Sequence, residues 1–188
     1  MKVIILLVVI SLTMSCVSPK SNRAESIRLT DSAVSLKLTA YMACDSIRTD
    51  SILRRSLSLL TTALEKDAMN SAAAENKITL EFLLDDYHSA ISTIKMYEKQ
   101  HGRIYPEMRF VWGLCALQSG CNTQARQLFK QARDEFRARN DTLNFYFVSC
   151  FLDGKQAVIA EIDTIQSLRN LKEMIQSVNL NNPKDLFK

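Results

Sequence analysis

The amino-acid sequence predicts an all-α protein. Its 188 residues include only four glycines and three prolines, whereas a β-rich fold needs many more of both to make its tight turns. The commonest residue types (Ala, Leu, Ser, Lys, Gln and Arg) favour helices as a group. Apolar residues also recur at helical spacing, most clearly at Ala125, Leu128, Phe129, Ala132 and Phe136.

The first 15 residues predict a signal peptide. Lys2 precedes ten residues, 3–12, that are apolar except for Ser11. Ten residues rise only about 15 Å as a helix, which is about half of a bilayer core. The segment is therefore too short to span a membrane and has the length of a signal-peptide hydrophobic region.

Cys16 is the predicted lipidation site. The small Ser15 directly before Cys16 resembles the lipobox of bacterial lipoproteins, although Thr13 stands where an aliphatic residue is usual. The resemblance implies that Cys16 is acylated and begins the mature chain, with a short tether over residues 16–23. Two or three acyl chains hold a protein stably on a membrane. The alternative is an ordinary secretory signal cut after Ser15.

Residues 106–139 carry the clearest internal pattern. Gly120 supplies a turn between two helices, and Pro106 suits a first helical position. Small side chains let the two helices approach, while Trp112 and Phe129 fill the space between them. The small and large positions are Trp112, Gly113, Ala116, Gly120, Ala125, Phe129 and Ala132. This spacing resembles the tetratricopeptide repeat (TPR) family, with Arg137 in place of the usual proline.

Two earlier units resemble the same family. Residues 71–105 place Ala90 at the position that Ala125 holds 35 residues later. Residues 37–70 end in Ala63–Asn70, which is similar to the family's junction between units. Three units in register are the signature of a repeat architecture.

The TPR resemblance covers residues 37–139 and implies an α-solenoid of antiparallel helical hairpins. We expect an N-terminal helix over residues 24–36 before the repeats, either separate from the first repeat helix or continuous with it. Residues 140–180 are expected to form a degenerate fourth hairpin, whose long helix at 155–178 caps the stack. Residues 181–188 are expected to be a tail.

The sequence contains no recognisable motif for catalysis, so we predict that the protein is not an enzyme and uses no cofactor. Its two histidines, His88 and His101, are 13 residues apart, whereas zinc hydrolases place two histidines one helical turn apart. Asp85 and Asp86 are expected to cap a helix rather than to bind metal. The dispersed formal charge of +4 argues against a nucleic-acid partner.

The remaining cysteines predict buried thiols rather than a bridge. Their spacing matches no disulfide framework or zinc site. Cys44, Cys115 and Cys150 fall inside apolar helical runs, while Cys121 follows a glycine turn. Their disulfide state is left open by the sequence.

The TPR resemblance also implies a concave groove lined by the first helix of each unit. Chaperone-binding members clamp a carboxylate there with Lys, Arg and Asn; only Asn76 matches, so we do not expect that activity. The partner-binding candidates are Tyr41, Met42, Asn76, Thr79, Phe82, Leu83, Phe110, Leu114 and Leu117. Exposed apolar grooves bind partner helices or peptides. Alternatively, residues 155–178 or 24–36 cover the groove.

Together these features predict a lipid-anchored scaffold of the bacterial cell envelope that binds another envelope protein. The lack of Asp after Cys16 favours the periplasmic face of the outer membrane. An alternative of a different class is a binder that sequesters a toxin, as immunity proteins do, or a small ligand. An enzyme would require His88 or His101 to be essential for some activity.

Overall fold

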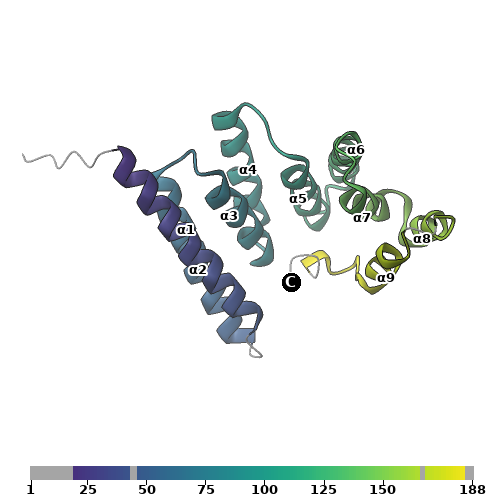
Figure 1. The fold of residues 1–188 in the computed structure, drawn as a ribbon, viewed down its shortest axis with the longest axis horizontal. Coiled ribbons are helices and arrows are strands. Elements are labelled where there is room, and N and C mark those ends of the chain that lie inside the picture. Colours follow the sequence, from purple (N-terminus) through teal and green to yellow (C-terminus); the bar gives the residue numbers. More distant parts are fainter. Residues whose placement is uncertain (1–18, 43–45, 166–167, 185–188) are drawn as a thin grey trace, which may run out of the picture.

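The computed structural model describes residues 19–42, 46–165 and 168–184, and these residues form nine α-helices and no strand. This confirms the all-α prediction. Successive helices pack on one another in chain order from one end of the molecule to the other (Figure 1). The helices are α1 (Pro19–Tyr41), α2 (Ser46–Lys66), α3 (Ser71–Leu83), α4 (Tyr87–His101), α5 (Pro106–Gln118), α6 (Asn122–Ala138), α7 (Thr142–Asp153), α8 (Lys155–Asp163) and α9 (Arg169–Ser177).

The first helical pair is longer than expected. α1 runs without interruption for 23 residues, so the predicted boundary between residues 36 and 37 falls inside one helix. Part of the predicted tether, from Pro19 onward, is also helical. No glycine or proline follows Pro19 before the end of α1, so no strong helix-breaking residue interrupts this stretch. The expected N-terminal helix is therefore continuous with the first repeat helix, and residues 37–70 contain the end of α1 and the whole of α2.

Small buried residues bring α1 and α2 together. The Ser26 hydroxyl donates to the Ala63 carbonyl at 2.7 Å, and the Ser56 hydroxyl donates to the Ala33 carbonyl at 2.6 Å. All four residues are fully buried. Because each hydroxyl has an acceptor on the other helix, burying it carries little penalty.

The two middle pairs fold back where the sequence predicts. Gly120 has φ +77° between α5 and α6, and Asp85 has φ +62° between α3 and α4. A Cβ placed on Gly113 would lie 2.5 Å from the Phe129 ring, so glycine is what allows α5 and α6 to approach this closely. Pro106 stands at the start of α5, as predicted.

Only one of the two predicted aspartates caps α4. The Asp86 carboxylate accepts a hydrogen bond from the Ser89 amide at 3.1 Å, as expected of a helix cap. Asp85 instead accepts a hydrogen bond from the Tyr87 hydroxyl and forms an ion pair with Lys184. Its left-handed backbone directs it away from the cap position.

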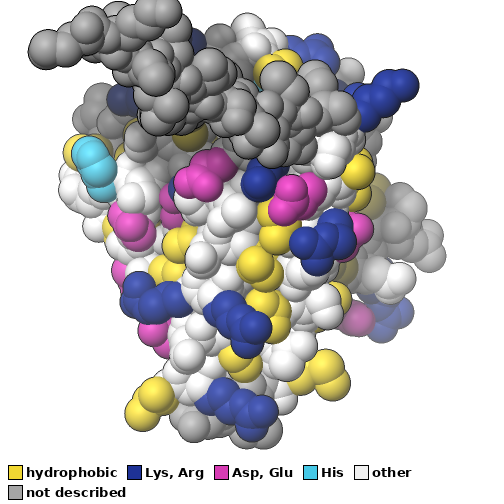
Figure 2. Space-filling view, turned by 90° about the vertical axis from the view of Figure 1, so that its left-hand side faces the viewer, with side chains coloured by type: hydrophobic (Ala, Val, Ile, Leu, Met, Phe, Trp, Pro, Cys, Tyr) yellow, Lys and Arg dark blue, Asp and Glu magenta, His cyan; other side chains and the backbone are white. Residues whose placement is uncertain are grey.

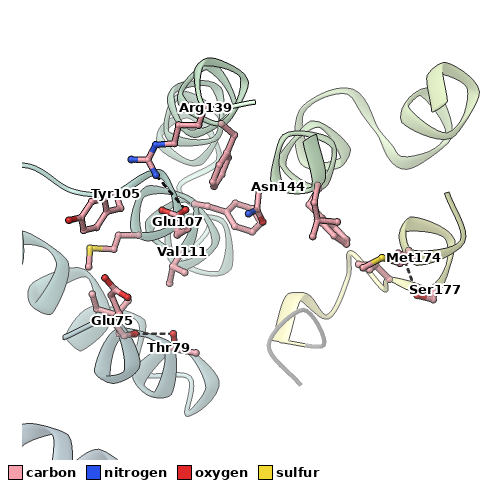
Figure 3. Close-up of a pocket in the computed structure, with 16 residues that line it drawn as sticks. Glu75, Thr79, Tyr105, Glu107, Val111, Arg139, Asn144, Met174 and Ser177 are labelled. Carbon is pink, nitrogen blue, oxygen red and sulfur yellow. Dashed lines mark hydrogen bonds and ion pairs between the residues drawn. The ribbon is translucent and has the colours of Figure 1, made fainter. Parts of the chain in front are cut away.

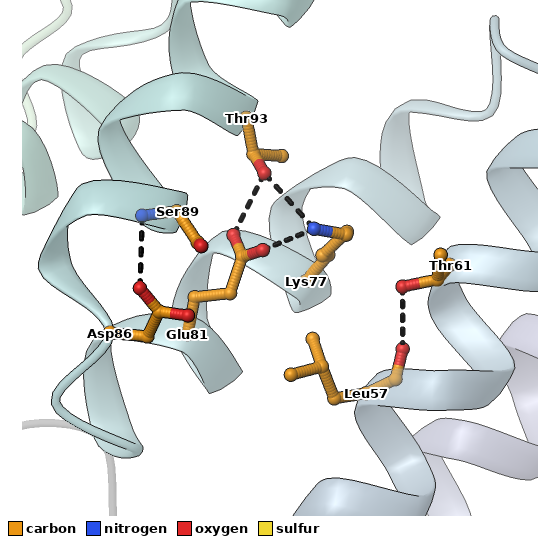
Figure 4. A network of polar contacts seen from close by, with 7 residues as sticks. All are labelled: Leu57, Thr61, Lys77, Glu81, Asp86, Ser89 and Thr93. Carbon is orange, nitrogen blue, oxygen red and sulfur yellow. Dashed lines mark hydrogen bonds and ion pairs between the residues drawn. The ribbon is translucent and has the colours of Figure 1, made fainter.

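A buried polar network fastens α3 to α4 (Figure 4). Lys77 on α3 forms an ion pair with Glu81 one turn later. Thr93 on α4 accepts a hydrogen bond from Lys77 at 3.1 Å and donates one to Glu81 at 2.8 Å. Glu81 and Thr93 are both buried. The Glu81 charge is therefore matched by a cation and by a donor from the neighbouring helix.

The C-terminal part contains two helices where the sequence predicts one over residues 155–178. α8 ends at Asp163, where the Thr164 hydroxyl donates to the Glu161 carbonyl at 2.7 Å. The chain then resumes as α9 and is tied back by a Lys172–Asp163 ion pair at 2.6 Å. The break lets α8 and α9 both pack apolar residues into the cluster that contains Tyr146 of α7. A single straight helix over residues 155–178 would extend past this cluster and could not pack the apolar residues of both α8 and α9 into it.

The chain beyond α9 turns back toward α3 and α4 (Figure 1). Lys184 pairs with Asp85 at 2.6 Å, and Pro183 is buried. Residues 181–184 are therefore packed against the fold, although the sequence predicts a tail from residue 181. Residues 185–188 lie outside the described part.

The outer face of α1 and α2 carries basic and acidic side chains interspersed with apolar and uncharged ones (Figure 2). Several large apolar residues are exposed on these two helices, including Ile27, Leu38 and Ile47. In the described ranges, every helix is too short or too polar to cross a bilayer. The predicted signal peptide and Cys16 lie outside those ranges.

Candidate functional site

A cavity of about 840 Å³ lies between α3, α5 and α7 on one side and α9 on the other (Figure 3). Its lining residues come from five helices, α3, α5, α6, α7 and α9, and from three residues next to helix ends. They are Glu75, Ile78, Thr79, Tyr105, Glu107, Met108, Phe110, Val111, Phe136, Arg139, Leu143, Asn144, Phe147, Met174, Ser177 and Val178. This volume falls within the range of small-molecule and peptide-side-chain pockets.

Most of the lining is apolar. Phe110, Val111 and Phe136 are buried members of the main core cluster, so they form a rigid wall. Leu143 on α7 is 40% exposed and Met174 on α9 is 48% exposed. These two side chains are accessible apolar surface at the opening of the cavity.

Three of the polar lining residues are already satisfied within the protein. The Thr79 hydroxyl donates to the Glu75 carbonyl at 3.0 Å, and the Ser177 hydroxyl donates to the Met174 carbonyl at 2.7 Å. The Asn144 amide donates to the Asp141 carboxylate at 2.8 Å. These groups therefore add little polarity to the cavity.

The charged lining residues are Glu75, Glu107 and Arg139. Arg139 pairs with Glu107 at 3.6 Å and lies over the Tyr105 ring, 5.8 Å from its centre. Glu75 on α3 points toward the same region (Figure 3). Partial burial, and then the nearby Glu107 charge, raise the pKa of Glu75 above its usual value.

Only part of the predicted groove lies in this cavity. Thr79 and Phe110 line it. Asn76 is already engaged, because its side-chain oxygen accepts a hydrogen bond from Lys37 at 2.6 Å. Phe82 and Leu114 are both 0% exposed and form core packing rather than a rim.

The other predicted groove residues lie elsewhere. Leu83 and Leu117 are partly buried against the two larger core clusters. Tyr41 is the last residue of α1, and Met42 follows the helix and is highly exposed. None of these four residues lines the cavity. The first helical pair is longer than predicted, so the family positions assigned to Tyr41 and Met42 do not correspond to the middle of a first helix.

Residues 155–178 were expected as one possible cover of the groove, but the lining residues of α7 were not among the predicted site residues. Leu143 and Phe147 are spaced one helical turn apart, and this spacing could have indicated an apolar face on α7. Met174 and Val178 have the same spacing on α9. Their position opposite α3 depends on the turn after α8, which local sequence does not reveal.

The C-terminal helix forms one wall of the cavity without filling it. Met174, Ser177 and Val178 face the cavity from α9 and its end. Residues 24–36, the other predicted cover, are absent from the lining. The groove on this side is therefore partly enclosed by the chain itself.

The described cysteines are all free. Cys115 and Cys150 are buried, as predicted, and Cys121 is exposed. Burial raises the pKa of Cys115 to about 12, with a further contribution from Glu81, and raises the pKa of Cys150 to about 11. Cys44 lies outside the described residues. Within the described ranges, no group of three or more His, Cys, Asp and Glu side chains is arranged to hold a metal ion.

Comparison with known proteins identifies no relative of this chain. No protein-family model, no curated protein and no solved structure matches it.

Proposed function

We propose that this protein is a lipid-anchored scaffold of the bacterial cell envelope that binds a segment of another envelope protein in the cavity between α3, α5, α7 and α9. The main support for this proposal is the cavity itself. It combines accessible apolar surface at Leu143 and Met174 with a rigid wall at Phe110. Exposed apolar surface of this kind marks interaction sites in soluble domains. We also propose that the protein acts as a binding protein and not as an enzyme.

A TPR-like arrangement is part of the proposal. α3, α5 and α7 begin at Ser71, Pro106 and Thr142, so a first helix recurs after about 35 residues. These three helices each contribute to the cavity, which agrees with a repeat architecture that binds partners through its first helices. The contact of Gly113 with Phe129 supports the same assignment.

The membrane anchor of the proposal rests on the sequence. Cys16 after Ser15 is the lipidation site, and acylation would hold the domain at the membrane. The proposed location is the periplasmic face of the outer membrane. Cys16→Ala is expected to abolish incorporation of labelled palmitate and to release the protein from the membrane fraction. Continued labelling of the Cys16→Ala protein would contradict the lipid anchor but not the cavity.

Affinity capture from the native envelope fraction tests the binding role. The Leu143→Asp, Met174→Asp double variant places charges on exposed cavity residues and is expected to lose the captured partner. Because both side chains are substantially exposed, the fold should survive the change. Circular dichroism and thermal unfolding verify that it does.

Met96→Asp is the matched control. Met96 on α4 is 47% exposed, almost as much as Met174, and it lies outside the cavity. The Met96→Asp variant should capture the same partner as the wild-type chain. Equal capture by the double variant and the wild type would mean that the cavity is not the binding site.

A further inference from the structure

The Glu75 carboxylate lacks a counter-charge. Among the residues that the structure describes, none forms an ion pair with it or donates a hydrogen bond to it. The charge of the neighbouring Glu107 opposes its ionisation, and Arg139 is committed to Glu107. Glu75 thus lies at the cavity as a solvent-exposed acceptor without a partner among the described residues.

The charge balance of the cavity is negative. Two carboxylates, Glu75 and Glu107, and one guanidinium, Arg139, line it. One negative charge consequently remains uncompensated by the described lining. A positive group brought next to Glu75 would offset both the partial desolvation of this carboxylate and its repulsion by Glu107.

The residues around Glu75 are mostly apolar, so they favour an occupant with apolar groups beside its positive charge. Ile78 follows it on α3 by nearly one helical turn, and Val111 and Met108 of α5 lie in the same lining. The hydroxyl of Thr79 is bonded to its own helix. An occupant must therefore present apolar surface to these walls and a donor at the Glu75 end.

We infer that the cavity binds a partner segment carrying a Lys or Arg side chain beside apolar residues, with the cation paired to Glu75. The inference rests on the proposed function, because it specifies the chemistry of the segment bound at that site. Charge complementarity points to this occupant rather than to an acidic segment. Here the protein supplies the carboxylate and the partner the cation, whereas in a carboxylate clamp the protein supplies the cations.

The test uses three fluorescein-labelled peptides with identical leucine positions and Lys, Gln or Glu at every polar position. Each is titrated with the purified full chain by fluorescence anisotropy at low and high salt. The Lys peptide is expected to bind about fivefold more tightly than the Gln peptide, and the Glu peptide most weakly. The preference should shrink as salt screens the pair.

Two cavity variants should change the preference in opposite directions. Glu75→Gln removes the uncompensated charge and is expected to bring the Lys-to-Gln ratio close to one. Arg139→Gln removes the positive charge beside Glu107 and is expected to raise the ratio. Glu98→Gln, at an exposed position on α4 outside the cavity, should leave it unchanged.

The outcomes separate this inference from the proposed function. Equal binding of the three peptides, or an unchanged ratio in Glu75→Gln, overturns the cationic preference. If Leu143→Asp, Met174→Asp still loses the envelope partner, the scaffold proposal remains. Failure of all three peptides to bind at up to about 1 mM also overturns the inference, whatever the capture experiment returns.

Discussion

At the scale of single residues, the closest approach of two helices depends on Gly113. The Phe129 ring occupies the space that a side chain at Gly113 would need. That ring is itself held by Phe110 and Phe151, whose ring centres lie 5.7 Å and 5.2 Å away. Because the ring is packed on several sides, it has little room to yield.

Gly113→Ala is expected to lower the free energy of unfolding by about 1–3 kcal/mol because of overpacking. Helix propensity alone predicts the opposite, a gain of about 1 kcal/mol, so the sign of the effect is diagnostic. Urea denaturation followed by circular dichroism measures it. Adding Phe129→Leu should recover part of the loss, since the smaller side chain vacates the clash. A stabilising Gly113→Ala would show that the α5–α6 contact is misassigned.

Single residues also show which features of the site could be predicted from the sequence and which could not. The packing of Gly113 on Phe129 was predicted correctly, because the pattern reports contacts between neighbouring helices. Trp112, which was predicted to fill the same space, is only partly buried and lies beside Lys95 of α4. Phe82 and Leu114 were assigned to an open groove, yet both are fully buried. A helical period alone does not distinguish a face that meets another helix from one that meets solvent.

At the scale of helices, the Lys77–Glu81–Thr93 network decides how α3 sits on α4. The side chain of Glu81 is 3% exposed and that of Lys77 15% exposed. Removing one partner from such a pair leaves a buried charge without compensation, and this usually costs more than the pair contributes.

Lys77→Met is expected to destabilise the fold by about 3–5 kcal/mol, because Glu81 then loses its cation. The Lys77→Met, Glu81→Met double variant should be considerably more stable than Lys77→Met. Thermal and urea unfolding of the two variants measure the difference. If the double variant is the less stable of the two, the polar network contributes more than apolar packing could replace.

The lengths of two predicted helices differ from those in the structure. α1 continues past residue 36, and residues 155–178 break into α8 and α9. In both places the apolar spacing is compatible with one helix or two. Packing against α2 in the first case, and against α7 in the second, decides between them.

At the scale of the whole molecule, the Asp85–Lys184 ion pair links the end of the chain to the turn between α3 and α4. The contact joins segments about 100 residues apart. It holds the chain that follows α9, and α9 forms the outer wall of the cavity. The contact therefore attaches the segment after α9 to the turn between α3 and α4.

Lys184→Gln is expected to increase amide hydrogen exchange in α9 relative to the wild-type chain, because the segment after this helix loses its attachment. Exchange followed by mass spectrometry measures the change peptide by peptide. Lys130→Gln, at an exposed position on α6, is the control and should leave α9 unaffected. Unaltered exchange in Lys184→Gln would mean that the ion pair does not restrain α9.

The same contact gives a pH dependence with a defined sign. Hydrogen bonds from Lys184 and then from Tyr87 lower the pKa of Asp85 below its ordinary value of 3.8. A carboxyl group with a lowered pKa in the folded state stabilises that state above its unfolded pKa. The contribution should be lost as the pH falls through the folded-state value. The protection of α9 amides, taken relative to the intrinsic exchange rate at each pH, should therefore fall below about pH 3.8 in the wild type and change less in Lys184→Gln.

The sequence by itself determined the helical content, the fold-back at Gly120 and the small-to-large packing of Gly113 on Phe129. Each of these depends on residues close together in the chain, whose spacing directly encodes which side chains share a helical face. Only the tertiary structure decided which residues line the cavity. Its walls at Glu75 and Met174 come from helices about 100 residues apart, and their meeting depends on how every intervening helix packs.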